Sequence, residues 1–164
     1  MIKEYIHKIY ILRDLKRYNN SLRIKEESVA EHSAFVSLIV LKLSEEYTFD
    51  INAALKMALT HDLSEIYVTD IPHNVKDRFP HVKEAIEIAE KNTFIKEFPA
   101  ISSYFLELLQ GTSTEAKIVQ YADVLSCQQY AKSEMKLGNK SMQRVYDESV
   151  ERATELEKEL GDKK

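Results

Sequence analysis

Two adjacent residues, His61 and Asp62, have side chains that could carry chemistry. They follow an apolar run at 53–59, where a helix is expected to pack, and they precede Ser64 and Glu65. Burying an imidazole or a carboxylate without a partner costs several kcal/mol. A divalent cation would compensate, because neutral imidazole and carboxylate are ligands of zinc and of first-row transition metals. From the pair alone, a metal site and a solvated helix end are equally good interpretations.

Two other polar residues fall on predicted buried faces of separate helices. His32 shares a helical face with four apolar residues, at Phe35, Val36, Ile39 and Leu43. Asp123 shares a face with small and apolar residues, at Ala116, Val119, Ser126, Cys127 and Tyr130. Either residue alone is more readily a core group with a hydrogen-bond partner than a ligand. His and Asp are seldom buried without a partner. A separate explanation for each of three such positions is therefore less convincing than it is for one position alone.

The elements that must position these residues are predicted to be helices, from the spacing of apolar residues. The predicted helices cover 2–15, a segment from Ser28, a segment from 51 into the His61–Asp62 pair, 79–98, 101–109, a segment from Ser113 or Thr114, and 141–160. Their predicted inward faces include Ile2, Tyr5, Ile6, Ile9 and Leu12 or Ile11 in the first helix, and Ile51, Ala54, Leu55, Ala58 and Leu59 in the third. The chain shows no internal repeat or linker, so we predict one all-α domain over 1–164.

Local signals support these boundaries. Ser28 is followed three residues later by Glu31, which predicts a capping box, and Asp50 is a good N-cap for the helix that begins at 51. Gly111 is expected to end the short helix before it. Pro72 disfavours the helical conformation in the residue before it, so Asp70 is expected in a loop.

Composition excludes several classes of protein. The single cysteine, Cys127, excludes an internal disulfide and a cysteine-based zinc site, favours a reducing cytoplasmic setting, and is expected to be a small core residue. The net charge of −4 and the pI of about 5.8 argue against binding a nucleic acid polymer. The N-terminal residues lack the apolar core of a signal peptide, and no apolar stretch is long enough to span a membrane.

The motifs together resemble those of the HD-domain metal-dependent phosphohydrolases. The segments Glu31-His32-Ser33, His61-Asp62-Leu63-Ser64-Glu65, Thr69-Asp70-Ile71-Pro72 and Ala122-Asp123 are similar to those of a small subgroup, the YfbR-like 5'-deoxynucleotidases. A bare His-Asp motif is weakly specific, whereas His-Asp-x-Ser-Glu followed by Asp-x-Pro is a strong signature. The resemblance covers most of 5–137.

The resemblance implies an HD-domain helical bundle that holds one divalent metal ion between helices, through His32, His61, Asp62 and Asp123. Cobalt, manganese, iron, nickel, zinc and magnesium are all candidates for that ion. Two further acids of the family match Glu65 and Asp70. An early Arg-aromatic pair, thought to contact phosphate and sugar or base, matches Arg17 and Tyr18, although the aromatic residue of the family is commonly Trp. The family also suggests a homodimer.

The chemistry follows from the residue types. A metal ion with open coordination positions can take a water molecule and a phosphate oxygen, which suits hydrolysis of phosphate esters. Glu65 would orient or deprotonate the water and Asp70 would assist the leaving 5'-oxygen, or the two roles would be exchanged. Arg17 offers a planar guanidinium to the phosphate, and Lys76 is a weaker candidate for the same role. His7, His73 and His81 are expected to be solvated, with His73 near enough to line the site.

The leading interpretation is hydrolysis of the 5'-phosphate of deoxyribonucleoside monophosphates. One alternative is a deoxynucleoside triphosphate triphosphohydrolase. A second alternative, from a different class, is a nucleotide-sensing protein that retains the fold and metal without turnover. The presence of all four ligand positions and both additional acids argues against this last interpretation.

Overall fold

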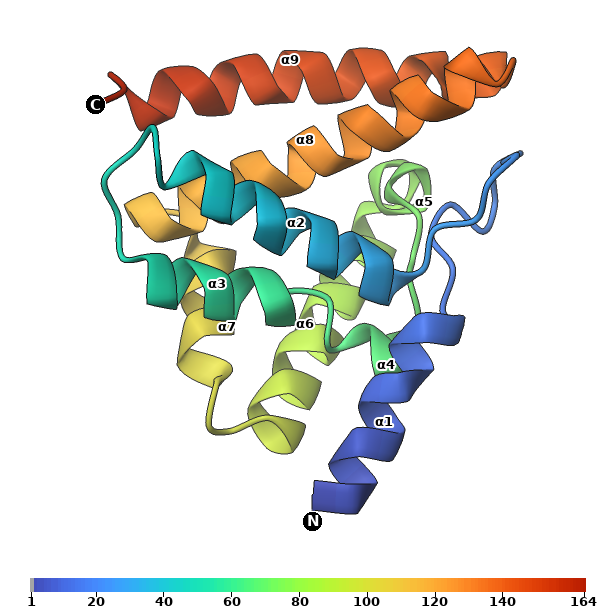
Figure 1. Ribbon diagram of the computed structural model, residues 1–164. Coiled ribbons are helices and arrows are strands. Elements are labelled where there is room, and N and C mark those ends of the chain that lie inside the picture. Colours follow the sequence, from blue (N-terminus) through green and yellow to red (C-terminus); the bar gives the residue numbers. More distant parts are fainter. Residues whose placement is uncertain (1) are drawn as a thin grey trace.

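The computed structural model describes residues 2–164, apart from the side chains of His73, Asn74 and Asp77. Every regular element in this part of the chain is helical, as the sequence predicts (Figure 1). The elements are α1 (Ile2–Asp14), α2 (Val29–Leu43), α3 (Ile51–Thr60), α4 (Glu65–Val68), α5 (His73–Arg78), α6 (Pro80–Glu97), α7 (Ser102–Gln110), α8 (Thr114–Lys136), the 3-10 helix η1 (Lys140–Met142) and α9 (Gln143–Leu160).

The predicted helix ends are confirmed where capping residues mark them. Ser28 and Glu31 form both hydrogen bonds of the capping box at the start of α2. The side chain of Asp50 accepts hydrogen bonds from two backbone N–H groups at the start of α3. Gly111 follows α7 with a φ of 65°, a conformation that glycine adopts without steric cost.

The main core lies between α2, α3, α8 and α9. Figure 1 shows α9 lying along α8 and covering one side of the bundle. Val36 and Val40 of α2, Met57 of α3 and Ile118 of α8 are fully buried in this core. A second, smaller cluster joins α1 to α6 and α7, with Phe94 stacked on Phe105. The helices that bear His32, His61 and Asp123 therefore form the most tightly packed part of the molecule.

Some predicted inward positions are wrong. Phe35 is 52% exposed and Leu59 is 56% exposed, although both were expected to face the core. Because α2 packs between α3 and α8, its buried face turns toward Ser33 and Ser37, whose small side chains allow close approach. Within α1 only Leu12 is buried, because this helix contacts the bundle mainly at its C-terminal end.

The segment between α3 and α6 consists of short helices rather than one long one. It contains α4 and α5, separated by Thr69, which has a φ of 63°, and by Pro72. A left-handed conformation is costly for a β-branched residue, and the proline disfavours helix in the residue before it. Asp70 therefore lies outside any helix, as predicted. Among residues 2–164, no helix is both long and apolar enough to cross a membrane.

Candidate active site

Three helices bring the predicted ligands together. His32 lies in the first turn of α2, His61 caps the C-terminus of α3 with Asp62 next to it, and Asp123 lies in the middle of α8. The Nε2 atom of His32 is 2.9 Å from Oδ1 of Asp123 and 3.9 Å from Oδ2 of Asp62. The Nε2 atom of His61 is 3.1 Å from Oδ2 of Asp62. The four side chains thus surround one small volume at the end of the helix core.

The two imidazoles are oriented by hydrogen bonds at their other nitrogens. Nδ1 of His61 lies 2.8 Å from the carbonyl oxygen of Ala58, so it must carry the proton and donate it. Nδ1 of His32 lies 3.2 Å from Oγ of Ser126. A proton on Nδ1 leaves Nε2 with a free lone pair, which is how histidine ligands are prepared for a metal.

The donor set fits a divalent cation. Both Nε2 atoms are buried and form no hydrogen bond of acceptable geometry. Groups of three that could hold an ion are His32, His61 and Asp62 on one side, and His32, Asp123 and Cys127 on the other, so His32 belongs to both. Buried polar atoms without partners are costly, and a cation facing nitrogen and oxygen donors would remove that cost.

Cys127 differs from its predicted role as a small core residue. Its Sγ atom lies 3.6 Å from Oδ1 of Asp123, one helical turn earlier, and accepts a hydrogen bond of 3.4 Å from Nη2 of Arg17. The side chain lines a cavity instead of packing into the apolar core. Burial nevertheless raises the pKa of the thiol to about 12.

In this cluster, burial and the neighbouring charges have opposite effects on the pKa values of the carboxylates and imidazoles. Burial opposes ionisation of Asp62, but the neighbouring His61 outweighs it and lowers the pKa of Asp62 to about 2. Burial would likewise lower the pKa of His61, yet Asp62 raises it to about 9. The pKa of Asp123 is held well below its ordinary value against burial, chiefly by the adjacent imidazole of His32. Two ionised carboxylates beside two imidazoles form a natural cation site.

The two additional acids lie beside the cluster but on different elements. Glu65 is the first residue of α4, and its Oε2 atom is buried without a hydrogen-bond partner. Burial raises the pKa of Glu65 to about 10, and the charges of Asp62 and Asp70 add to the shift. Burial also raises the pKa of Asp70, while Arg17 lowers it. Both carboxyls are therefore set up to hold protons more tightly than free acids do.

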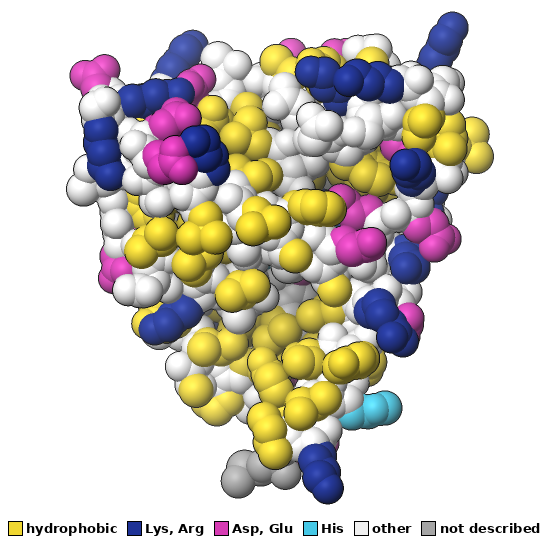
Figure 2. All heavy atoms as spheres, in the orientation of Figure 1, with side chains coloured by type: hydrophobic (Ala, Val, Ile, Leu, Met, Phe, Trp, Pro, Cys, Tyr) yellow, Lys and Arg dark blue, Asp and Glu magenta, His cyan; other side chains and the backbone are white. Residues whose placement is uncertain are grey.

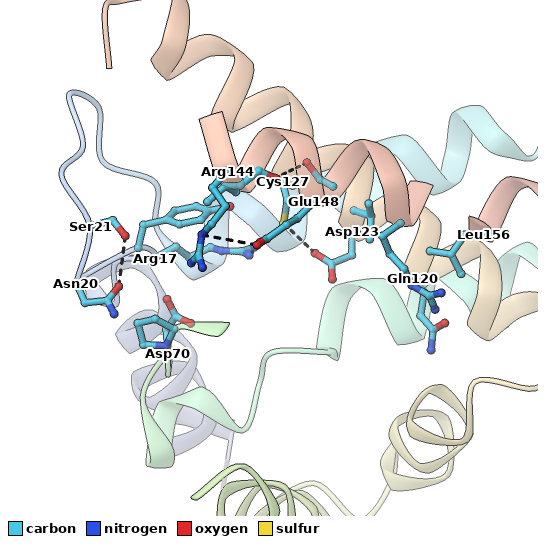
Figure 3. A pocket seen from close by; sticks show the side chains of 16 residues that line it. Arg17, Asn20, Ser21, Asp70, Gln120, Asp123, Cys127, Arg144, Glu148 and Leu156 are labelled. Carbon is cyan, nitrogen blue, oxygen red and sulfur yellow. Dashed lines mark hydrogen bonds and ion pairs between the residues drawn. The ribbon is translucent and has the colours of Figure 1, made fainter. Parts of the chain in front are cut away.

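A cavity of about 590 Å³ opens onto the cluster and is large enough for a nucleotide. Figure 3 shows Asn20 and Asp70 at one end, Asp123 and Cys127 in the middle, and Gln120 and Leu156 at the other end. The walls come from the loop before α2, the loop before α5, and helices α8 and α9.

Arg17 and Tyr18, to which the family resemblance assigns substrate binding, line this cavity. The Nη1 atom of Arg17 is buried without a hydrogen-bond partner, and its Nε lies 3.9 Å from Oε2 of Glu27. The ring of Tyr18 stacks on Tyr130 with a centroid separation of 4.7 Å and lies 5.5 Å from the Arg17 guanidinium carbon. One face of Tyr18 is thus already covered by protein.

Lys76 is less directly placed than Arg17. Its Nζ lies 3.4 Å from Oε1 of Glu90 in α6, and it is not among the residues that line the cavity. Its charge still lowers the pKa of both Glu65 and Asp70, so it lies on the same side of the molecule. His7 and His81 are exposed, as predicted, whereas the side chain of His73 lies outside the described residues.

Sequence reasoning missed several residues of the site. Glu27 is buried beside Arg17, and Arg144 and Glu148 of α9 form part of the cavity wall. A buried glutamate just before an N-cap offers no periodic signal. Arg144 and Glu148 lie one turn apart on a helix and read as an ordinary surface ion pair.

Comparison with known proteins agrees with this geometry. A family model described as 5'-deoxynucleotidase YfbR-like matches residues 4–160. A 5'-deoxynucleotidase of Pasteurella multocida is 32% identical over 142 residues, which cover 78% of this chain and 72% of that protein. A 5'-deoxynucleotidase of Photorhabdus temperata is 28% identical over 142 residues with the same coverage.

Solved structures give the same fold. A protein from Pyrococcus horikoshii superposes with a TM-score of 0.76 at 31% identity, covering 91% of this chain and 88% of that one. An HD-domain phosphohydrolase from Listeria innocua has a TM-score of 0.80 at 24% identity, covering 96% and 82%. The chain therefore has the HD-domain fold and belongs to the YfbR-like 5'-deoxynucleotidase family.

Proposed function

We propose that this protein is a metal-dependent 5'-deoxynucleotidase, which hydrolyses deoxyribonucleoside monophosphates to deoxynucleosides and phosphate. The observation that carries the proposal is a group of unpartnered buried atoms around the carboxylates of Asp62 and Asp123: Nε2 of His32 and of His61, Nη1 of Arg17 and Oε2 of Glu65. Such atoms are expected where a cation and an anion bind. The named 5'-deoxynucleotidase relatives support the reaction.

His32, His61, Asp62 and Asp123 would hold a single divalent cation. When bound there, the cation supplies Lewis-acid chemistry, lowering the pKa of a water molecule and offsetting charge on the phosphate. The set of two nitrogen and two oxygen donors suits manganese, iron, cobalt, nickel or zinc, with magnesium the harder alternative. We do not assign Cys127 to this set, because its Sγ already accepts the hydrogen bond from Arg17.

The remaining residues would handle the proton transfers and the substrate charge. Glu65 in its ionised form would accept a proton from the attacking water through Oε2 as the new bond to phosphorus forms. A cation held by Asp62 would favour that ionised form, because it would offset one of the charges that raise the pKa of Glu65. The bond between phosphorus and the 5'-oxygen breaks, and Asp70 would give its proton to that oxygen, so that a nucleoside leaves. The raised pKa of Asp70 suits an acid, and the two acids could exchange roles. Arg17 would bind the phosphate oxygens, with Tyr18 beside the sugar or base and Lys76 as a more distant cation.

We also propose a homodimer in a reducing, cytoplasmic setting. Figure 2 shows hydrophobic side chains spread over the face that α1, α2 and α3 present in Figure 1, and Phe35 and Leu38 are among the exposed apolar residues. Exposed apolar surface of this kind is typical of oligomers. Light scattering after gel filtration would support the dimer by a mass of twice 19.0 kDa and would contradict it by a mass of 19.0 kDa.

The function is tested by incubating the purified protein with Co²⁺, Mn²⁺ or Mg²⁺ and a panel of deoxynucleotides. Release of phosphate from monophosphates, with little from ribonucleotides, is the expected result. Release of triphosphate from deoxynucleoside triphosphates would favour the alternative reaction. Absence of turnover with retained metal would indicate a nucleotide-sensing protein instead.

A further inference from the structure

The loop that carries Arg17 and Tyr18 is held to α8 by a residue outside the cavity. Glu134, near the C-terminus of α8, is only 1% exposed although it is a carboxylate. Its Oε2 accepts hydrogen bonds from the backbone N–H of Ile24 at 2.6 Å and from Nδ2 of Asn139 at 2.8 Å. Its Oε1 accepts a hydrogen bond from the backbone N–H of Lys25 at 2.8 Å.

These contacts matter because the loop has little apolar burial of its own. Leu22 is 80% exposed and Ile24 is 56% exposed. A loop whose apolar side chains are exposed gains little stability from packing, so it opens easily unless hydrogen bonds hold it. Besides Glu134, α8 and the turn after it supply two further bonds: Tyr130 Oη donates to the carbonyl of Lys25, and Asn139 Nδ2 donates to that of Leu22.

The same loop fixes the cavity residues at its N-terminal end. The Nη1 atom of Arg23 donates hydrogen bonds to the carbonyl oxygens of Arg17 and Tyr18, at 3.2 and 2.8 Å. Tyr18 has a φ of 55°, a left-handed conformation that costs a non-glycine residue about 1 kcal/mol or more. Such a conformation persists only when the surroundings impose it. The stack of Tyr18 on Tyr130 ties this residue to the same face of α8 that anchors Lys25.

We propose that Glu134 is a positioning residue, which clamps the loop at 17–27 against α8 and thereby sets the affinity of Arg17 and Tyr18 for the phosphorylated substrate. The proposal rests on the proposed function for its kinetic consequence. Glu134 lies outside the residues that line the active-site cavity, so it acts only through the loop. A buried carboxylate with three N–H donors is well suited to this role, because each bond is charge-assisted.

The test is the variant Glu134→Gln, which keeps the size of the side chain but replaces one acceptor oxygen by a donor that faces a backbone N–H. We expect KM for dAMP or TMP to rise about tenfold, with kcat changed less than about threefold and the metal content unchanged. The matched control is Glu151→Gln, on an exposed residue of α9, with unchanged KM. An unchanged KM in Glu134→Gln would overturn the proposal.

A double-mutant cycle separates positioning from a general loss of structure. In the background of Arg17→Ala, the further change Glu134→Gln should raise KM by less than about fourfold, because one of the two residues that it positions is already gone. A full tenfold rise in that background would overturn the proposal. If Glu134→Gln does not fold, Tyr130→Phe removes only the bond to the Lys25 carbonyl and should raise KM in the same direction; an unchanged KM would count against the clamp.

Hydrogen exchange gives an outcome that does not depend on substrate. In Glu134→Gln the backbone amides of 18–27 should lose protection by about tenfold in exchange rate, while those of α2 and α3 stay unchanged. Unchanged protection of 18–27 would overturn the clamp even if the wild type hydrolyses no deoxynucleotide. Turnover by the wild type, measured in parallel, tests the proposed function separately.

Discussion

The site joins two regions that are held in different ways. His32 lies on α2 and Asp123 on α8, on faces that also contribute to the main core, while His61 caps the C-terminus of α3 and Asp62 follows it in the turn. Arg17 and Asp70 lie instead outside the helices, on connecting segments, while Glu65 lies on the four-residue helix α4. The first region is fixed by close packing of buried side chains. In the second, the loop at 17–27 is held by hydrogen bonds to α8 and to the turn after it.

The difference matches what we propose that each region binds. A cation needs donors at fixed distances, and positions on packed helices provide them. A substrate must enter and leave, so the groups that contact it lie on elements with little apolar burial. We call His32, His61, Asp62 and Asp123 the helix-borne cluster, and Arg17, Glu65 and Asp70 with their connecting segments the loop-borne region. We therefore expect changes in the helix-borne cluster to abolish function, and changes in the loop-borne region to alter affinity, rate or stability more gradually.

The largest effect is expected from Asp123→Asn in the helix-borne cluster. Removing this charge should lower the metal content to below about one tenth of an ion per chain and lower kcat/KM by about 10³-fold or more. Metal content is measured by atomic emission after gel filtration. Asp147→Asn, on an exposed residue of α9, is the matched control. Normal metal content and turnover in Asp123→Asn would show that the cluster is not the metal site.

Glu65→Gln should separate the second region from the first. We expect kcat to fall by about 10²-fold while the metal content stays at the wild-type value, because a proton acceptor is lost but no ligand is removed. The melting temperature of the metal-free protein should rise, since the variant removes a buried acid whose pKa is raised to about 10. A variant that loses its metal would place Glu65 among the ligands and would contradict the division between the regions.

The helix-borne cluster could be predicted from sequence because its positions are periodic. His32 and Asp123 fall on faces with apolar neighbours, and periodicity alone places them inside. The rotation of each face was less certain: Phe35 and Leu59 were placed inward and lie outward. Tertiary packing decides which residues of a helix face inward, because α2 packs between two neighbouring helices on the face that carries Ser33 and Ser37.

The loop-borne region was predicted only where motif residues mark it. Arg17 and Asp70 were identified from the resemblance, but Glu27, Glu134 and Cys127 were not assigned roles in the site. A carboxylate that accepts backbone N–H groups of a loop more than 100 positions away leaves no local pattern. Only the three-dimensional contacts reveal which polar residues hold such a loop.

Arg17→Lys tests whether the guanidinium geometry matters within the loop-borne region. A lysine keeps the charge but cannot present two parallel N–H groups to a phosphate. We expect KM for dAMP to rise about tenfold with kcat reduced less than threefold and unchanged metal content. The measurement is steady-state kinetics over a range of substrate concentrations. A KM equal to that of the wild type would indicate that Arg17 contributes charge alone or does not contact the phosphate.

The smallest effect is expected from Glu27→Gln, and it concerns stability. Burial raises the pKa of Glu27 from 4.5 to about 7 against the opposing charge of Arg17. Between these two values the unfolded chain loses its proton while the folded protein keeps it, so the wild-type free energy of unfolding falls as pH rises from 4.5 to 7. Glu27→Gln should remove the contribution of Glu27, so that over this pH range the free energy of unfolding decreases by about 1 kcal/mol less than in the wild type. We expect this modest difference because the loop can open toward water and limit the cost of burying the carboxylate.

Urea unfolding at several pH values between 4.5 and 8, followed by circular dichroism, measures this change in slope. Glu151→Gln, on an exposed residue, should leave the wild-type dependence intact. An equal decrease in Glu27→Gln and wild type would mean that the loop already admits water to Glu27. The carboxylate would then be solvated beside Arg17, and the loop-borne region would be more open than its hydrogen bonds imply.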